Sequence, residues 1–190
     1  GGGGSIGAGL VAKAAPDGYT LGVSTLSTHA VIGACNPKVS YDPIKDFKAI
    51  TNMAGSPNVL TVNPKFPAQD FKQFLAYVKK NPGKFSYATS GPCSIQQMVG
   101  EQFKMETGTD ILHVPYRGAG PALNDLLGGS VDMMFDNLPS SMSHIKSERL
   151  RESGAEPVGN TPAQHAAEIK QEGERMRALV KAQNIRFEGS

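Results

Sequence analysis

The sequence predicts an α/β fold in which helices cover the faces of a mostly parallel β-sheet. Between residues 57 and 135, four short apolar runs alternate with three helical patterns. Chains that alternate in this way form parallel sheets, because each helix carries the chain back across the sheet. The composition agrees: 39% of the 190 residues are hydrophobic and 19% are charged, which is typical of a globular protein and not of a disordered, collagen-like or coiled-coil one.

The predicted strands are short and apolar. Residues 59–62 read Val-Leu-Thr-Val and end at Asn63-Pro64, and the next three strands are predicted at 85–88, 111–114 and 131–135. A further strand, Tyr-Thr-Leu-Gly-Val, is predicted at residues 19–23 after the turn at 16–18. It leads into a polar segment, 24–29, and residues 33–48 are expected to be an irregular connection.

The helices follow from apolar spacing and from capping residues. Phe71, Phe74, Leu75 and Val78 are spaced i, i+3, i+4, i+7, which predicts an amphipathic helix over 68–80. Ser94 and Gln97 fit a capping box, so a helix is predicted from residue 95 to Gly108. Other helices are expected at 6–15, from Pro121 to the pair Gly128-Gly129, and from the capping sequence Thr161-Pro162-Ala-Gln164 to about residue 183.

Charge and motifs exclude several classes of function. Nineteen basic and 17 acidic residues leave a formal charge of +2, too little for the basic face of a nucleic-acid-binding protein. There is no apolar run of about 18 residues that could span a membrane. The sequence also lacks the usual hydrolase, zinc-protease and phosphate-loop motifs and any metal-type His or Cys spacing. We therefore expect no catalytic residue, no metal and no cofactor.

Three polar segments are candidates for ligand binding: residues 24–29, 89–94 and 116–120. Each lies where a predicted strand ends, and in open α/β sheets ligands bind at this edge. Backbone N–H groups and hydroxyls at a helix N-terminus suit a carboxylate or phosphate. In the second segment, Thr89, Ser90, Cys93 and Ser94 either hold a ligand carboxylate or merely form a turn with a Ser94 cap. Asp136 is either a site residue or the cap of a turn.

Several motifs in a fixed order resemble one family. They are Val11-Ala-Lys-Ala-Ala-Pro-Asp-Gly-Tyr-Thr-Leu21, Tyr41-Asp-Pro-Ile-Lys-Asp-Phe47, Asn81-Pro-Gly-Lys84, His113-Val-Pro-Tyr-Arg-Gly118, Pro121-Ala-Leu-Asn-Asp-Leu-Leu127 and Met134-Phe-Asp-Asn137. This series, with the closing segment from Gly154, resembles the Bug, or TctC-type, periplasmic solute-binding proteins of bacterial tripartite tricarboxylate transporters.

The resemblance implies a fold like that of periplasmic binding proteins, a Venus flytrap of two lobes that closes on a small carboxylated solute. Residues 1–56 with 151–190 would form the first lobe and residues 57–150 the second. The matching ligand-binding positions are Ser27, Thr28, His29, Thr89, Ser90, Cys93, Ser94 and Asp136. An acidic amino acid such as aspartate or glutamate is the preferred ligand, with Asp136 facing its amino group, and a dicarboxylate is the alternative.

The resemblance also implies partners and a location. The receptor would deliver its solute to the membrane subunits of a tripartite transporter, would not itself enter the membrane, and would reside in the bacterial periplasm. The sequence does not start with a charged segment followed by an apolar one, so we expect the signal peptide to be absent from it. Periplasmic export would permit a disulfide between Cys35 and Cys93, which would clamp a first-lobe loop to the ligand loop; the alternative is that the two sulfurs never approach.

The sequence departs from the family in two places. Compared with the family, we expect the opening strand and loop to be missing before Gly1 and a further block to be missing where Leu150 runs into Arg151, either because they are deleted or because the sequence given omits them. The first lobe is therefore expected to be incomplete and binding by this chain alone to be weak. The alternatives are a shortened scaffold with a structural or interaction role and lost binding, or, less favoured, an α/β hydrolase. Residues 1–5 resemble a flexible linker but also fit a native glycine-rich loop.

Overall fold

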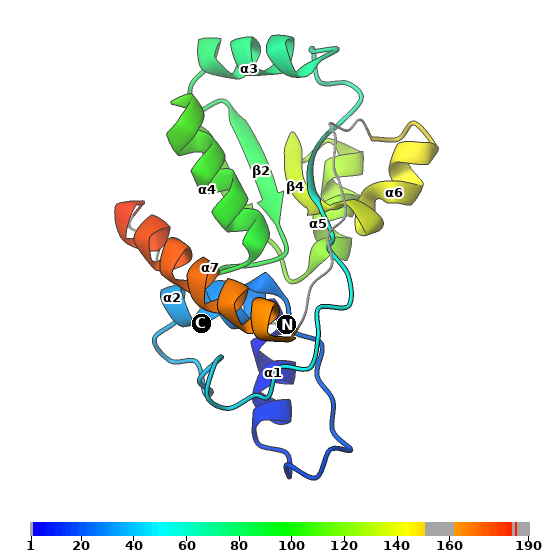
Figure 1. Cartoon of the computed structure of the whole chain (residues 1–190). Helices are drawn as coiled ribbons and strands as arrows, with labels where there is room; N and C mark the ends of the chain where they lie inside the picture. The colour runs from blue at the N-terminus through cyan, green and yellow to red at the C-terminus, as the bar shows by residue number, and fades with distance from the viewer. Residues whose placement is uncertain (1, 151–161, 184, 186–190) are drawn as a thin grey trace.

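The computed structural model describes residues 2–150, 162–183 and 185, and its core is a four-stranded sheet (Figure 1). The strands are β1 (Asn58–Val62), β2 (Phe85–Thr89), β3 (Ile111–Pro115) and β4 (Met133–Asn137), in the order β1-β4-β2-β3. Strand β2 is parallel to both β3 and β4, whereas β1 is antiparallel to β4. The predicted strands of this region are thus confirmed, with β1 as an antiparallel edge that the alternation alone did not predict.

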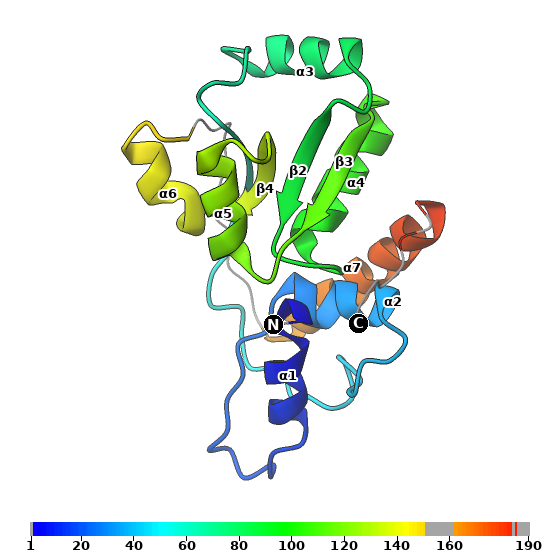
Figure 2. The ribbon, with the colours of Figure 1, turned by 180° about the vertical axis from the view of Figure 1, so that it is seen from behind.

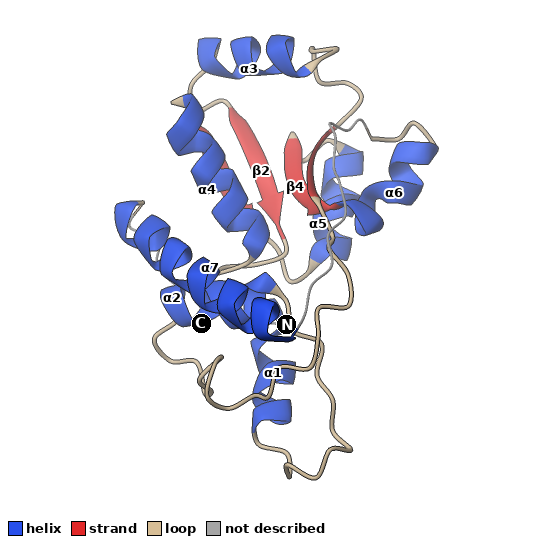
Figure 3. Cartoon of the chain, in the orientation of Figure 1, coloured by secondary structure: helices blue, strands red, loops and turns tan. Residues whose placement is uncertain are grey.

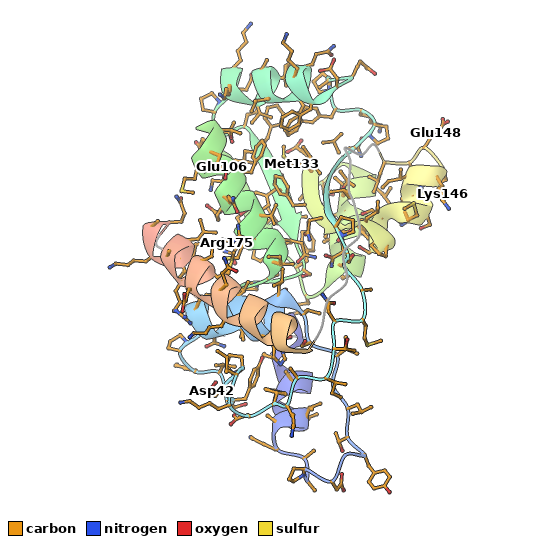
Figure 4. All side chains as sticks on the ribbon, viewed as in Figure 1. Asp42, Glu106, Met133, Lys146, Glu148 and Arg175 are labelled. Carbon is orange, nitrogen blue, oxygen red and sulfur yellow. A yellow bond between two sulfur atoms is a disulfide. The ribbon has the colours of Figure 1, made fainter. Side chains whose placement is uncertain are left out.

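Helices cover both faces of this sheet, as the two opposite views show (Figures 1 and 2). Helix α4 (Ile95–Thr107) lies over one face, and α3 (Phe71–Lys80) crosses the end of the sheet beside it, where Phe74 and Val78 pack among buried aromatic residues. Helices α5 (Ala119–Gly128) and α6 (Leu138–Lys146) pack on the other face. Met133 lies in the middle of the sheet and is fully buried (Figure 4).

Helix α6 is the element of this region that the sequence analysis missed. It begins directly after β4, with Asn137 at the N-cap position and Pro139 in the first turn. A proline there costs nothing, because its missing N–H would have no partner in the helix. Asn137 at the N-cap position and Pro139 in the first turn therefore form the local pattern from which α6 could have been predicted.

A second group of helices lies at the edge of the sheet where β2 and β3 end (Figure 3). It contains a short 3-10 turn at Gly2–Gly4, helix α1 (Ser5–Ala12), the π-helical turn η2 (Ser27–Val31), α2 (Ile32–Cys35) and α7 (Pro162–Ala182). Helix α7 packs on η2 and α2, and Met176 and Leu179 enter a shared core with Val31 and Ile32. The predicted C-terminal helix is confirmed, although its capping residue Thr161 lies outside the described residues.

Two expectations for the N-terminal part are wrong. Residues 19–23 form no strand, and Tyr19, Leu21 and Val23 are 92%, 71% and 79% exposed. A strand needs a hydrogen-bonded neighbour, and the described part of the chain places none beside this segment. Residues 33–35, at the start of the stretch expected to be irregular, are helical, because the helical backbone of η2 continues through Cys35.

Within the described ranges, no helix is both long and apolar enough to cross a bilayer. The same residues contain no group of three or more His, Cys, Asp or Glu side chains arranged to hold a metal ion.

Candidate functional site

The N-terminus of α4 is the centre of the candidate site, and capping residues fix its shape. Ser94 is the N-cap, and its hydroxyl accepts a hydrogen bond from the backbone N–H of Gln97 at 3.3 Å. The Gln97 side chain accepts from the N–H of Cys93 at 2.8 Å. This is a capping box shifted by one residue, since the usual acceptor bonds the N-cap residue itself. The capping role predicted for Ser94 is confirmed.

The first polar segment meets this helix end directly. The Ser27 hydroxyl oxygen accepts a hydrogen bond from the backbone N–H of Ile95 at 3.0 Å. Ile95 is the first residue of α4, and its N–H has no acceptor within the helix. The first turn of η2 is therefore joined to the N-terminus of α4 by one hydroxyl group.

A disulfide between Cys35 and Cys93 makes a second connection. It joins the last residue of α2 to the loop before α4, with Cα atoms 6.0 Å apart. Both cysteines are buried in a core that also contains Ile95, Met98 and residues of α7. Of the two alternatives for these cysteines, the structure contains the paired form. Cys93 has a positive φ of 59°, a conformation that non-glycine residues rarely adopt.

The third polar segment lies beside the second. The N–H of Tyr116 donates to the Thr89 carbonyl at 3.0 Å, and the N–H of Gly118 donates to the Ser90 carbonyl at 3.0 Å. Gly91 has a φ of 140°, and a Cβ there would lie 3.2 Å from the Tyr116 carbonyl oxygen. A side chain at Gly91 would thus be both strained and crowded. All three polar segments meet at the edge where β2 and β3 end. Arg117 is exposed.

The glycine-rich start of the chain reaches the same place. A Cβ on Gly4 would lie 2.8 Å from Cγ2 of Thr28, and one on Gly3 would lie 3.7 Å from the Pro92 carbonyl oxygen. Both glycines have positive φ values, 90° and 62°. Their lack of side chains lets the turn before α1 approach η2 and the 89–94 loop closely. The start of α1 therefore lies next to η2 and to the loop before α4.

The electrostatics of this place favour an anion. Neither α1, η2 nor α4 carries an acidic residue in its first turn. The N-terminal end of a helix has partial positive charge from its unsatisfied N–H groups. With no carboxylate nearby in these turns to neutralise it, the charge is available to a ligand.

The predicted site residues are only partly brought together. Ser27, Thr89, Ser90, Cys93 and Ser94 surround the N-terminus of α4. Ser90 donates to the Gln96 side chain at 2.8 Å, and the Thr89 hydroxyl lies 2.8 Å from Nε2 of His113. Only Ser27 and Ser90 of these five are not fully buried. The side chains of Thr89, Cys93 and Ser94 can contact a solute only if the surrounding elements move. Otherwise these residues can contact it only through their backbone groups.

Thr28 and His29 directly follow Ser27 in η2 and are buried. The Thr28 hydroxyl lies 2.9 Å from Nδ1 of His29, and the Tyr41 hydroxyl donates to the Thr28 carbonyl at 2.8 Å. The His29 ring packs edge-on against Phe47 at 4.6 Å between centroids. These contacts fix η2 against the 41–47 segment.

Asp136 lies at the end of β4 and is 0% exposed. One carboxylate oxygen, Oδ2, accepts hydrogen bonds from the Ser140 and Ser141 hydroxyls at the start of α6. The other, Oδ1, is buried without a partner among the described residues. Asp136 forms no hydrogen bond with the other seven predicted residues in the part of the chain described. An unpaired buried carboxylate oxygen is costly unless a donor reaches it.

Two side chains behind the 89–94 loop were not assigned to the site from the sequence. They are Gln97 and His113, and both line a hollow of about 340 Å³ with Pro92, Glu101, Lys104, Pro115, Gln183 and Ile185. The capping box identified Gln97 only as a capping residue. His113 lies in β3 and stacks on the buried Tyr87 ring at 5.0 Å between centroids.

Comparisons with known proteins agree on one family. Residues 1–184 match the model of the tripartite tricarboxylate transporter family receptor. Protein BugT of Bordetella pertussis is 36% identical over 152 residues, which are 80% of this chain and 47% of BugT. The chain spans about half the length of the curated relatives it matches.

Solved structures show the same fold. That of a periplasmic transporter is 41% identical, has a TM-score of 0.90, and is aligned over 98% of this chain and 85% of its own. MatC from Rhodopseudomonas palustris, with bound malate, is 26% identical with a TM-score of 0.72 and is aligned over 96% of this chain and 74% of its own. The fold is that of the periplasmic binding proteins.

Proposed function

Since this chain belongs to the tripartite tricarboxylate transporter receptor family, we propose that it is a periplasmic receptor for a small carboxylated solute. The observation that carries the proposal is the contact between the first turn of η2 and the N-terminus of α4, where Ser27 accepts from the Ile95 N–H. No acidic residue lies in the first turn of either helix. Such a place attracts a carboxylate without any catalytic group.

A bound carboxylate would replace the Ser27 hydroxyl as the acceptor for the Ile95 N–H. Ser27 would then turn its hydrogen toward the solute and become a donor, as a hydroxyl can do either. Ser90 is the second side chain near the surface here, and Thr28, His29, Thr89, Cys93 and Ser94 are proposed to contribute through backbone groups or through the shape they give the loop. We propose that residues 1–56 with 151–190, and residues 57–150, are the two lobes that enclose the solute.

The preferred solute is an acidic amino acid, with a dicarboxylate as the alternative. The bound malate of MatC supports a dicarboxylate. The unpaired Oδ1 of Asp136 supports an amino acid, because an ammonium group would supply the missing donor. The solute would be passed to the membrane subunits of a tripartite transporter.

Calorimetric titration of the chain with aspartate, glutamate, malate and citrate tests the proposal, with malamide and succinamide, which carry no carboxylate, as matched uncharged solutes. We expect heat of binding and a raised Tm with at least one carboxylate and neither with the amides, because a ligand stabilises only the fold that binds it. The affinity is expected to be weak, so each solute is carried to high concentration.

The variant Ser27→Ala should weaken that binding several-fold, since it removes one donor to the solute. Ser143→Ala is the matched control, because Ser143 is exposed on α6. Equal responses to carboxylates and amides, or none to any solute, would favour the shortened scaffold that has lost its site. Turnover of ester or phosphate substrates that is abolished by Ser27→Ala or Ser94→Ala would instead favour a hydrolase.

A further inference from the structure

The 89–94 loop is held from behind by a chain of side-chain hydrogen bonds. Gln97 Oε1 accepts from the Cys93 N–H at 2.8 Å, and Gln97 Nε2 lies 3.5 Å from Nδ1 of His113. On the other side of the ring, His113 Nε2 lies 2.8 Å from the Thr89 hydroxyl. This series of hydrogen bonds therefore starts near one end of the loop, passes through His113 on β3, and reaches the other end of the loop at Thr89.

The direction of each hydrogen bond follows from the first one. Because Gln97 Oε1 faces the Cys93 N–H, its NH₂ group faces His113, and an NH₂ group can only donate. Nδ1 of His113 is then the acceptor, so Nε2 carries the ring hydrogen and donates to Thr89. The Thr89 hydroxyl is left to donate to the Gly91 carbonyl at 3.3 Å. One neutral tautomer of His113 satisfies every member of the chain.

The surroundings of His113 favour this uncharged ring. It stacks on Tyr87, whose hydroxyl donates to Glu101 at 2.6 Å, and Glu101 pairs with Lys104 at 3.1 Å. Burial lowers the pKa of His113 to about 4, with opposing smaller effects from Glu101 and Lys104. The two charged neighbours thus neutralise each other and leave the ring to act as a hydrogen-bonding spacer.

We propose that His113 and Gln97 are positioning residues of the solute site, which set the shape of the 89–94 loop without touching the solute. The proposal rests on the function proposed above. A binding loop keeps its geometry only if the groups behind it fix its backbone and hydroxyls, and here those groups come from two rigid elements, α4 and β3. Residues that act in this way lie outside the contact surface and are invisible to a search for ligand-binding motifs.

The test compares His113→Leu with His113→Gln. Leucine removes both ring nitrogens, whereas the glutamine amide can reach Thr89 from the position of Nε2. We expect His113→Leu to weaken binding of the best carboxylate, aspartate or malate, at least tenfold, and His113→Gln to stay within about threefold of the parent chain. His144→Leu, on α6, is the matched control and should leave affinity unchanged. Equal affinity for all these chains would overturn the proposal.

Amide hydrogen exchange and ¹⁵N NMR decide the question even if no carboxylate binds. We expect His113→Leu to speed exchange of the Cys93 amide at least tenfold while the amides of α3 are unchanged, and His113→Gln to restore protection. In the parent chain, the ring ¹⁵N shifts should be those of the Nε2–H tautomer. Unchanged Cys93 exchange, or an Nδ1–H tautomer, would refute the positioning role. Absence of binding with these signatures present would refute only the receptor function.

Discussion

Residues 57–150 and residues 2–56 carry similar local signals, yet they are packed very differently. Val59 and Tyr19 both begin short apolar runs that the sequence predicts as strands. Val59 is buried in β1, which pairs along its whole length with β4, whereas Tyr19 is almost fully exposed in a segment without regular structure. Strand propensity becomes a strand only where a neighbour supplies hydrogen bonds and a face to pack on.

The disulfide ties these two regions together, so its removal should have the largest effect. It closes a loop of 58 residues between Cys35 and Cys93. Chain-entropy arguments give about 4 kcal/mol of unfolding free energy for a loop of this size. Chemical denaturation of the double variant Cys35→Ser, Cys93→Ser, compared with the oxidised and reduced parent chain, measures the loss. Matching midpoints for the oxidised parent chain and the double variant would mean that other contacts suffice to hold the regions together.

Acidification tests the interior of the second region through His113. Its pKa is about 4 in the folded chain, below the value of about 6.5 of an unfolded histidine. The unfolded state binds the proton first, so stability is complete above pH 6.5 and falls as the pH drops from 6.5 to 4. The loss from this group is up to about 3 kcal/mol. Urea unfolding at several pH values should show a smaller loss for His113→Gln; identical profiles would exclude His113 as the source.

Glycine-to-alanine substitutions compare packing in the two regions. A Cβ on Gly100 of α4 would press against the buried Tyr87 ring, 2.6 Å from Cζ, whereas nothing lies within 4 Å of one on Gly7 of α1. We expect Gly100→Ala to lower the free energy of unfolding by about 1–3 kcal/mol, because an overpacked core must shift. Gly7→Ala should be neutral or stabilising by up to about 1 kcal/mol. Thermal unfolding of both variants and the parent chain measures these changes in stability. A stabilising Gly100→Ala would contradict the packing described.

The smallest effect on the free energy of unfolding is expected for polar substitutions in the exposed run at residues 19–23, in contrast to the same kind of substitution in β1. Leu21→Ser with Val23→Thr is expected to change stability by less than about 0.5 kcal/mol, as is usual for exposed positions. Val59→Thr, its counterpart in β1, should cost about 1–3 kcal/mol, because it buries a hydroxyl. Sedimentation velocity adds a second measurement. A large loss of stability or a change in association state for the first variant would show that residues 19–23 are covered in solution.

Much of the site was predictable because its signals are local. The Ser94 cap depends on a spacing of three residues, and the polar segments were identified from their places after predicted strands. The contact between His113 and Gln97 could not be predicted from such local signals. The contact between the two side chains depends on where along β3 helix α4 packs, and no local sequence pattern specifies that position. The Cys35–Cys93 pairing was likewise left open, because the two cysteines are 58 positions apart in the sequence.

The sequence by itself determined the helices and strands of residues 57–135 and the polar composition of the loops between them, since hydrophobic periodicity and capping act within a few residues. Tertiary structure alone decided that β1 runs antiparallel to its neighbour, that residues 19–23 remain unpaired, and that Ser27 meets Ile95. Those outcomes depend on which surfaces become neighbours after the chain collapses, and that choice balances the whole core at once.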